Sequence, residues 1–186
     1  MKKIFQLTMI TLLTALLAGC GASAHKQVIL EKLRGEDEIF QYDNLAWGSS
    51  KEQTEKTLGV KLDETITSTE EYQAYLAEGS FTWNNVKGDL LCEFDQNGLN
   101  TVTFLFQPNE ADFEAFWSGL SEKLTSIYGD VEPKVVENAF LSTDLRTEAF
   151  TWDQEGSPHT VLSLSRYSSN GEQKYINISV YKLPEE

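Results

Sequence analysis

The chain has 186 residues, 40% of them hydrophobic, and carries 29 acidic against 15 basic side chains, which gives a formal net charge of −14. This acidic balance argues against nucleic-acid binding, which needs Lys and Arg to contact phosphates. It also disfavours direct contact with anionic lipid headgroups. Solubility alone would account for the charge equally well.

The N-terminus has the layout of a secretory signal peptide. Met1-Lys2-Lys3 is a short basic start, and a largely apolar stretch runs from Ile4 to Leu17. That stretch is shorter than the about 20 residues that a membrane-spanning helix needs. We therefore predict that residues 1–19 are a leader that is removed. The mature chain would keep 13 basic and 29 acidic side chains, a net charge of −16.

The leader ends in Leu17-Ala18-Gly19-Cys20, a leucine and two small residues before a cysteine. This tetrapeptide resembles the lipobox of bacterial lipoproteins. The resemblance implies cleavage before Cys20, thioether lipidation of its sulfur and acylation of the new amino terminus, and stable anchoring needs at least two such chains. The expected location is the extracytoplasmic face of the cell membrane, or the periplasmic side of an outer membrane. The alternative is an ordinary signal peptide with an incidental Cys20.

Residues 20–39 are expected to form the lipid-anchored tether, with a short helix within 25–34. Cys92 is the other cysteine of the chain. If Cys20 is acylated, no intramolecular disulfide can form, so the fold must rest on its core. About 145 residues after the tether suffice for one ordinary domain or two small ones.

The first unit is predicted over residues 40–108. A capping box, either Ser49 with Glu52 or Ser50 with Gln53, opens a helix that ends at Leu58-Gly59. A similar signal at 68–71 predicts a second helix, which would end at Gly79. Strands are expected over 80–86, 89–95 and 99–107, with a hairpin turn at Asn97-Gly98.

The second unit is predicted over residues 109–186. Residues 109–112 open a helix whose apolar positions recur at steps of three and four from Phe113 to Tyr128. Residues 130–147 favour neither helix nor strand. Strands are expected over 150–153, 159–167 and 174–183, with a turn at Asn170-Gly171.

The tripeptide Phe-Thr-Trp occurs at 81–83 and again at 150–152, at similar distances from Gly59 and Gly129. A strand, an Asn-Gly turn and a further strand follow each copy, which indicates a duplication. The expected fold class is α+β, with two tandem units, each a helical layer packed on a three-stranded antiparallel meander. One continuous α+β domain is the alternative.

The first unit shows Trp47-Gly48-Ser49 at a helix start, a stop at Gly59, an aromatic strand and then a hairpin. This order resembles the modules of the SmpA/OmlA outer-membrane assembly lipoproteins, and the tandem copies resemble the fold of the beta-lactamase inhibitory protein. The resemblance implies a non-enzymatic, protein-binding module outside the cytoplasm. No functional residue can be transferred from either family.

The residues give little sign of catalysis. The chain has two histidines, and it lacks the common motifs for a nucleophile elbow, a phosphate loop or a zinc protease. A serine-histidine site could use only His159, with Ser163 and Ser165 on the same predicted strand, although spacing alone does not bring the groups of such a site together. We therefore predict no enzyme activity, no cofactor and no metal site.

The last predicted strand alternates between two faces. Ile176, Ile178 and Val180 are expected to pack against the helix 113–128. The other face would carry a polar, tyrosine-rich set, which is typical of adaptable contact surfaces, although an ordinary solvated sheet face is the alternative. This set is the predicted partner-binding site, and its members are Tyr167, Tyr175, Asn177, Ser179 and Tyr181.

All four tryptophans are expected to pack in the core and not to form a ligand platform, with Trp47 as a hydrophobic staple before the first helix. The predicted function is a membrane-anchored, non-catalytic module that binds a protein in the cell envelope. A small-ligand or polysaccharide-binding lipoprotein, with Trp47 stacking on sugar, is the alternative.

Overall fold

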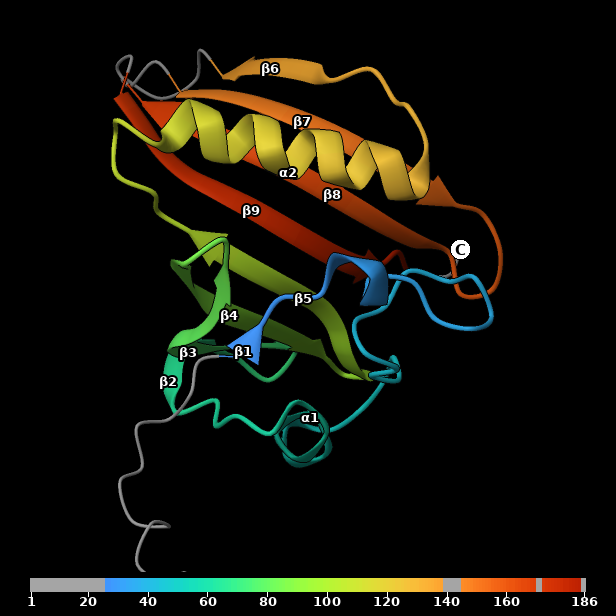
Figure 1. The fold of residues 1–186 in the computed structure, drawn as a ribbon. Coiled ribbons are helices and arrows are strands. Elements are labelled where there is room, and N and C mark those ends of the chain that lie inside the picture. Colours follow the sequence, from blue (N-terminus) through green and yellow to red (C-terminus); the bar gives the residue numbers. More distant parts are fainter. Residues whose placement is uncertain (1–25, 139–144, 170–171, 185–186) are drawn as a thin grey trace, which may run out of the picture.

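A computed structural model describes residues 26–138, 145–169 and 172–184 (Figure 1). The predicted leader, Cys20, the tether up to residue 25 and the Asn170-Gly171 turn lie outside these residues. The described part contains nine strands in one sheet. None of its helices is long and apolar enough to cross a membrane.

After a short first strand, the elements repeat the order of one helix followed by four strands. A 3-10 turn at Leu30–Lys32 comes before the first helix. The strands are β1 (Lys26–Gln27), β2 (Glu64–Ser68), β3 (Tyr72–Trp83), β4 (Val86–Asp95), β5 (Gly98–Phe106), β6 (Lys134–Asn138), β7 (Leu145–Gln154), β8 (Thr160–Ser169) and β9 (Glu172–Lys182), and the helices are α1 (Lys51–Leu58) and α2 (Phe113–Tyr128).

The strands form a single sheet in the order β1-β3-β4-β5-β9-β8-β7-β6, with β2 also paired to β3. All pairs are antiparallel except β1 with β3. The last strands of the two halves, β5 and β9, pair over 101–106 and 176–181. The expected fold class of two units, each a helical layer on a three-stranded meander, is therefore wrong, because the strands of both halves merge into one sheet with only one α-helix to each half.

The predicted second helix is instead part of strand β3. The capping signal at 68–71 forms a hairpin turn, in which the Tyr72 amide donates to Thr69 Oγ1 at 3.0 Å and the Thr69 amide donates to the Tyr72 carbonyl at 2.8 Å. β3 then pairs with β2 on one side and β4 on the other. These two rows of backbone hydrogen bonds override the local helix signal.

Helix α1 is confirmed to the residue at both ends. Ser50 accepts from the Gln53 amide, and the Gln53 side chain accepts from the Ser50 amide, so the second of the two proposed capping boxes is the real one. Gly59 ends the helix with φ of 58°, a left-handed conformation that glycine adopts without steric cost.

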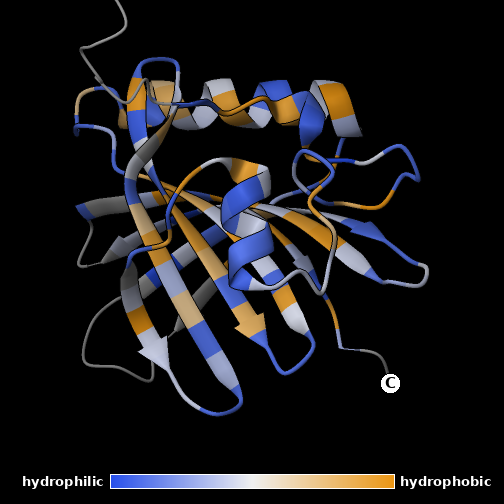
Figure 2. Ribbon diagram, turned by 90° about the horizontal axis from the view of Figure 1, so that it is seen from below, coloured by the Kyte–Doolittle hydropathy of each residue, from blue (hydrophilic) through white to orange (hydrophobic). Residues whose placement is uncertain are grey.

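One hydrophobic core fills one face of the sheet. Apolar side chains alternate with polar ones along the strands, as the bands of colour in Figure 2 show. Leu58 of α1 and one face of α2 belong to the same core, and so do the inward residues of β3, β4, β5, β7, β8 and β9. Both helices therefore cover this face, and Ile176, Ile178 and Val180 lie on it as expected.

Residues 26–39 belong to the folded body, although the sequence assigned them to the tether. β1 pairs with β3, and Val28, Leu30 and Leu33 are buried in the core. The Tyr128 hydroxyl of α2 donates to the Leu30 carbonyl at 2.6 Å. The expected short helix is only the 3-10 turn Leu30–Lys32.

The tryptophans lie where the sequence predicted. Trp83, Trp117 and Trp152 are buried in the core. Trp47 is partly buried against it, and its indole N–H donates to the Phe40 carbonyl at 3.1 Å.

Candidate functional site

The second face of the sheet is covered by neither α1 nor α2. Residues that alternate with the core positions point to it, and the strand register aligns them in rows across the sheet. One row runs through Leu76, Leu91, Thr103 and Ser179, and the next through Asp89, Leu105 and Asn177. This surface, the open face, therefore joins residues from both halves of the chain.

A groove with a volume of about 430 Å³ lies at one end of the open face. Its lining comes from six neighbouring strands, β2, β3, β4, β5, β9 and β8. Two large hydrophobic residues at its opposite sides are exposed to solvent. Ile66 is 53% accessible and Tyr175 is 47% accessible. The lining residues are Ile66, Leu76, Asp89, Leu91, Leu105, Tyr167, Tyr175 and Asn177.

Three of the five predicted site residues line this groove, namely Tyr167, Tyr175 and Asn177. Ser179 and Tyr181 lie farther along β9 on the same face. The Ser179 hydroxyl hydrogen-bonds to Thr103 Oγ1 at 2.9 Å. Tyr181 is partly buried, and burial, with a smaller contribution from the nearby Asp153 charge, raises the pKa of its hydroxyl. These two residues therefore have roles within the sheet and lie outside the groove.

The part of the lining that comes from the first half of the chain was not predicted from the sequence. The sequence did contain a signal for it. Consecutive apolar residues occur in two of these strands, at Leu90-Leu91 and at Phe104-Leu105-Phe106. An unbroken apolar run places apolar side chains on both faces of a strand. In β4 and β5, the apolar side chains that point away from the core line the groove.

Two polar groups lie in the otherwise apolar lining. Asp89 Oδ1 accepts a hydrogen bond from the Gly79 amide at 2.6 Å. Asn177 Oδ1 is buried and has no hydrogen-bond partner. An unpaired buried acceptor costs about 1–3 kcal/mol, so this oxygen is a place where a bound donor would add stability.

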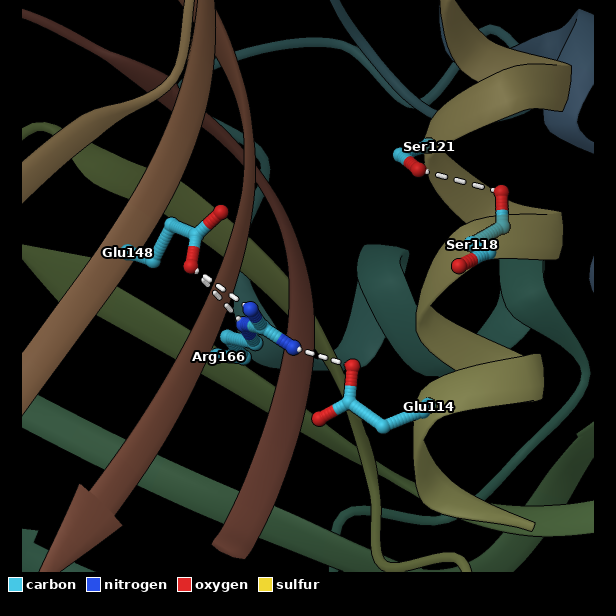
Figure 3. Close-up of polar contacts among 5 residues, drawn as sticks. All are labelled: Glu114, Ser118, Ser121, Glu148 and Arg166. Atoms are coloured by element: carbon cyan, nitrogen blue, oxygen red, sulfur yellow. Dashed lines mark hydrogen bonds and ion pairs between the residues drawn. The ribbon is translucent and has the colours of Figure 1, made fainter.

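A charged cluster on the helix-covered face has a different role. Arg166 of β8 binds Glu148 of β7 through Nη2 at 2.7 Å and Glu114 of α2 through Nη1 at 2.7 Å (Figure 3). The guanidinium also lies 4.9 Å from the centre of the Trp117 ring. Desolvation lowers the pKa of Arg166, but its hydrogen bonds to Glu148 and Glu114 raise it by more. The cluster joins the start of α2 to the sheet, and Ser118 and Ser121 beside it form a hydrogen bond within the helix.

The structure gives the surroundings of His159 and Ser165, two of the residues considered for catalysis, and of Cys92. His159 Nε2 lies 2.5 Å from Asp153 Oδ1. Ser165 is buried. Cys92 is fully buried, and desolvation raises the pKa of its thiol to about 12, so the reactive thiolate is not formed near neutral pH.

No protein-family model matches this chain, and neither a curated protein nor a solved structure shows significant similarity to it. The resemblance to the two families of binding proteins therefore stays a prediction, and the groove is the feature from which function can be argued.

Proposed function

We propose that this chain is a lipid-anchored, non-catalytic protein of the bacterial cell envelope, and that it binds a protein partner through the open face of its sheet. The groove is the observation that carries the proposal. It places the exposed apolar side chains of Ile66 and Tyr175 beside further aliphatic residues, on a face that neither helix covers. Apolar side chains that gather on an exposed surface favour an interaction site there.

Tyrosine and asparagine suit this role for a physical reason. Tyrosine supplies a large contact area and a hydrogen bond at low conformational cost, and asparagine adapts its hydrogen bonds to the partner. Tyr167, Tyr175 and Asn177 stand together at one side of the groove. Opposite them, Leu76 and Leu91 supply the apolar surface from which most binding energy comes.

The partner site can be tested by crosslinking the native anchored protein in cells and recovering its partner. The variant Ile66→Ser with Tyr175→Ala removes two exposed side chains, so it should leave the fold intact. We expect it to reduce partner recovery at least tenfold, because about 1.4 kcal/mol of lost contact energy gives that factor. Val135→Ser is the matched control, since Val135 is 46% exposed on β6, outside the groove. Equal partner recovery with both variants would show that the partner does not bind at the groove.

The anchor can be tested separately. Cys20→Ser removes the sulfur that the lipobox resemblance would lipidate, so we expect the protein to leave the membrane fraction for the soluble fraction. The fraction is measured by ultracentrifugation and immunoblotting, with Cys92→Ser as the control for cysteine loss. Retention of the Cys20→Ser variant in membranes would contradict lipid anchoring at this residue.

A small apolar ligand is the second candidate, because the groove volume of about 430 Å³ lies in the range of ligand pockets. A large thermal shift with such a compound, lost in the Ile66→Ser, Tyr175→Ala variant, would favour it over the protein partner. Trp47 lends no support to a sugar platform, because it packs against the core and its indole N–H is already bonded to Phe40.

A further inference from the structure

The shape of the groove restricts what can fill it. Its lining residues come from six consecutive strands of the sheet, from β2 to β8. Strands lie about 4.8 Å apart, so five steps between strands give about 24 Å. An extended chain of about seven residues covers that distance. A ligand that occupies the whole groove is therefore elongated, as a peptide segment is.

The two sides of the groove differ in chemistry. The side formed by β2 to β5 is aliphatic, with Ile66, Leu76, Leu91 and Leu105. The side formed by β8 and β9 carries two tyrosines and an asparagine. The first side can bind aliphatic side chains of a ligand. The second side can bind groups that combine apolar contact with a hydrogen bond.

Asp89 adds a charge to the aliphatic side of this surface. It lies on β4, within the aliphatic side, with Leu105 of β5 between it and Asn177, and the lining contains no basic residue. Among the described residues no cation pairs with Asp89. The whole mature chain is acidic as well, so the field at the groove favours a cationic group and disfavours an acidic one.

Asn177 on β9 and Asp89 on β4 lie in the same row across the sheet. Strand β5 separates them. Its side-chain oxygen has no partner. Rotation about the last side-chain bond of an asparagine is soft, so this oxygen can turn toward the groove and accept a hydrogen bond from an N–H of the occupant.

We infer that the groove binds an extended segment of a partner protein that presents aliphatic side chains and one lysine or arginine to it. The cation pairs with Asp89, the aliphatic side chains pack on Leu76, Leu91 and Leu105, and an N–H of the segment donates to Asn177. This inference rests on the proposed function and names the chemistry of the partner.

The test uses two fluorescein-labelled heptapeptides, Leu-Ser-Lys-Ser-Leu-Ser-Leu and the reversed sequence, which cover both chain directions. Their alternate residues point to one side when extended. Anisotropy titrations with the mature protein are expected to show saturable binding of one of them. Replacing its lysine by glutamate should weaken binding at least tenfold, and replacing its leucines by serine should abolish it.

Two protein variants with the same change of charge locate the cation site. Asp89→Asn removes the charge but keeps an oxygen that can accept from the Gly79 amide. It should therefore lower the affinity for the lysine peptide about fivefold. Asp130→Asn, at an exposed position after α2, should change the affinity less than twofold. The Ile66→Ser, Tyr175→Ala variant should weaken binding at least tenfold.

The inference is overturned if neither peptide binds, if the glutamate peptide binds as well as the lysine peptide, or if Asp130→Asn weakens binding as much as Asp89→Asn. Its failure differs from that of the proposed function. If groove variants lose the native partner but the peptides do not bind, only the peptide chemistry is wrong. If groove variants keep the native partner, the proposed function is wrong.

Discussion

Arg166 shows how a single charged residue is accommodated at a core position of a strand. It has the same orientation as Leu162 and Leu164, which points it to the helix-covered face. There it meets Glu148 and Glu114 and lies over the ring of Trp117. Charges that are partly removed from water need such partners, because desolvation penalises the ion.

Arg166→Leu is expected to lower the free energy of unfolding by about 2 kcal/mol, because it leaves the largely buried Glu148 carboxylate without its cation. Arg146→Leu removes an exposed arginine from the adjacent strand and should change stability by less than about 0.5 kcal/mol. Urea denaturation of both variants measures the difference. Similar values for the two would show that the cluster adds nothing beyond a surface charge.

At the scale of elements, the turn of the β4–β5 hairpin docks on the loop before α1. The Gly48 amide donates to the Leu99 carbonyl and the Leu99 amide to the Ser49 carbonyl, each at 2.9 Å. Gly98 has φ of 97°, and a Cβ there would lie 2.3 Å from the Gly48 carbonyl oxygen. The Asn97-Gly98 pair predicted the turn, but nothing in the sequence pointed to this contact.

Gly98→Ala is expected to destabilise the protein by about 3 kcal/mol, since it adds a clash with backbone to an unfavourable φ. Gly129→Ala is the matched control, because Gly129 has φ of 95° and open space around its Cβ position. Its cost should be about 1–2 kcal/mol, from the unfavourable backbone conformation alone. Thermal unfolding compares the two, and equal losses would mean that the hairpin does not dock on this loop.

Local signals predicted elements well where the local structure decides them. The Ser50–Gln53 box and Gly59 defined α1, and the apolar period defined α2. The helix predicted over 68–79 is wrong, because Ser-Thr-Glu-Glu fits a hairpin turn as well as a helix start. The pairing of β3 on both sides decides between the two. Strand β6, in the segment that favoured neither state, is likewise defined by its pairing with β7.

At the scale of the whole molecule, the pairing of β5 with β9 unites two halves into one body. It also explains why the sequence revealed only the tyrosine side of the groove. Periodicity assigned Tyr167, Tyr175 and Asn177 to the open face, but Leu76, Asp89 and Leu91 reach the same groove only through pairing between residues about 75 positions apart. No local pattern encodes such a pairing.

Because one hydrophobic core includes residues of both halves, we expect the protein to unfold in a single cooperative transition in urea. Residues 26–108 expressed alone should show no such transition, since β5 then lacks β9 and the core lacks α2. Circular dichroism and tryptophan fluorescence should give coincident curves for the whole chain. A cooperative transition of the isolated first half would contradict this view of one folding unit.

The position of β9 at the end of the chain also has a kinetic consequence. β5 lies at the centre of the finished sheet, yet its second neighbour is the last strand to be synthesised. Until β9 arrives, β5 is an edge strand whose free backbone groups and apolar residues such as Phe104 and Phe106 can pair with other chains. Pairing over such a sequence separation is slow, so folding must wait for the C-terminus, and the nascent chain stays prone to aggregation until residues 172–182 have joined the sheet.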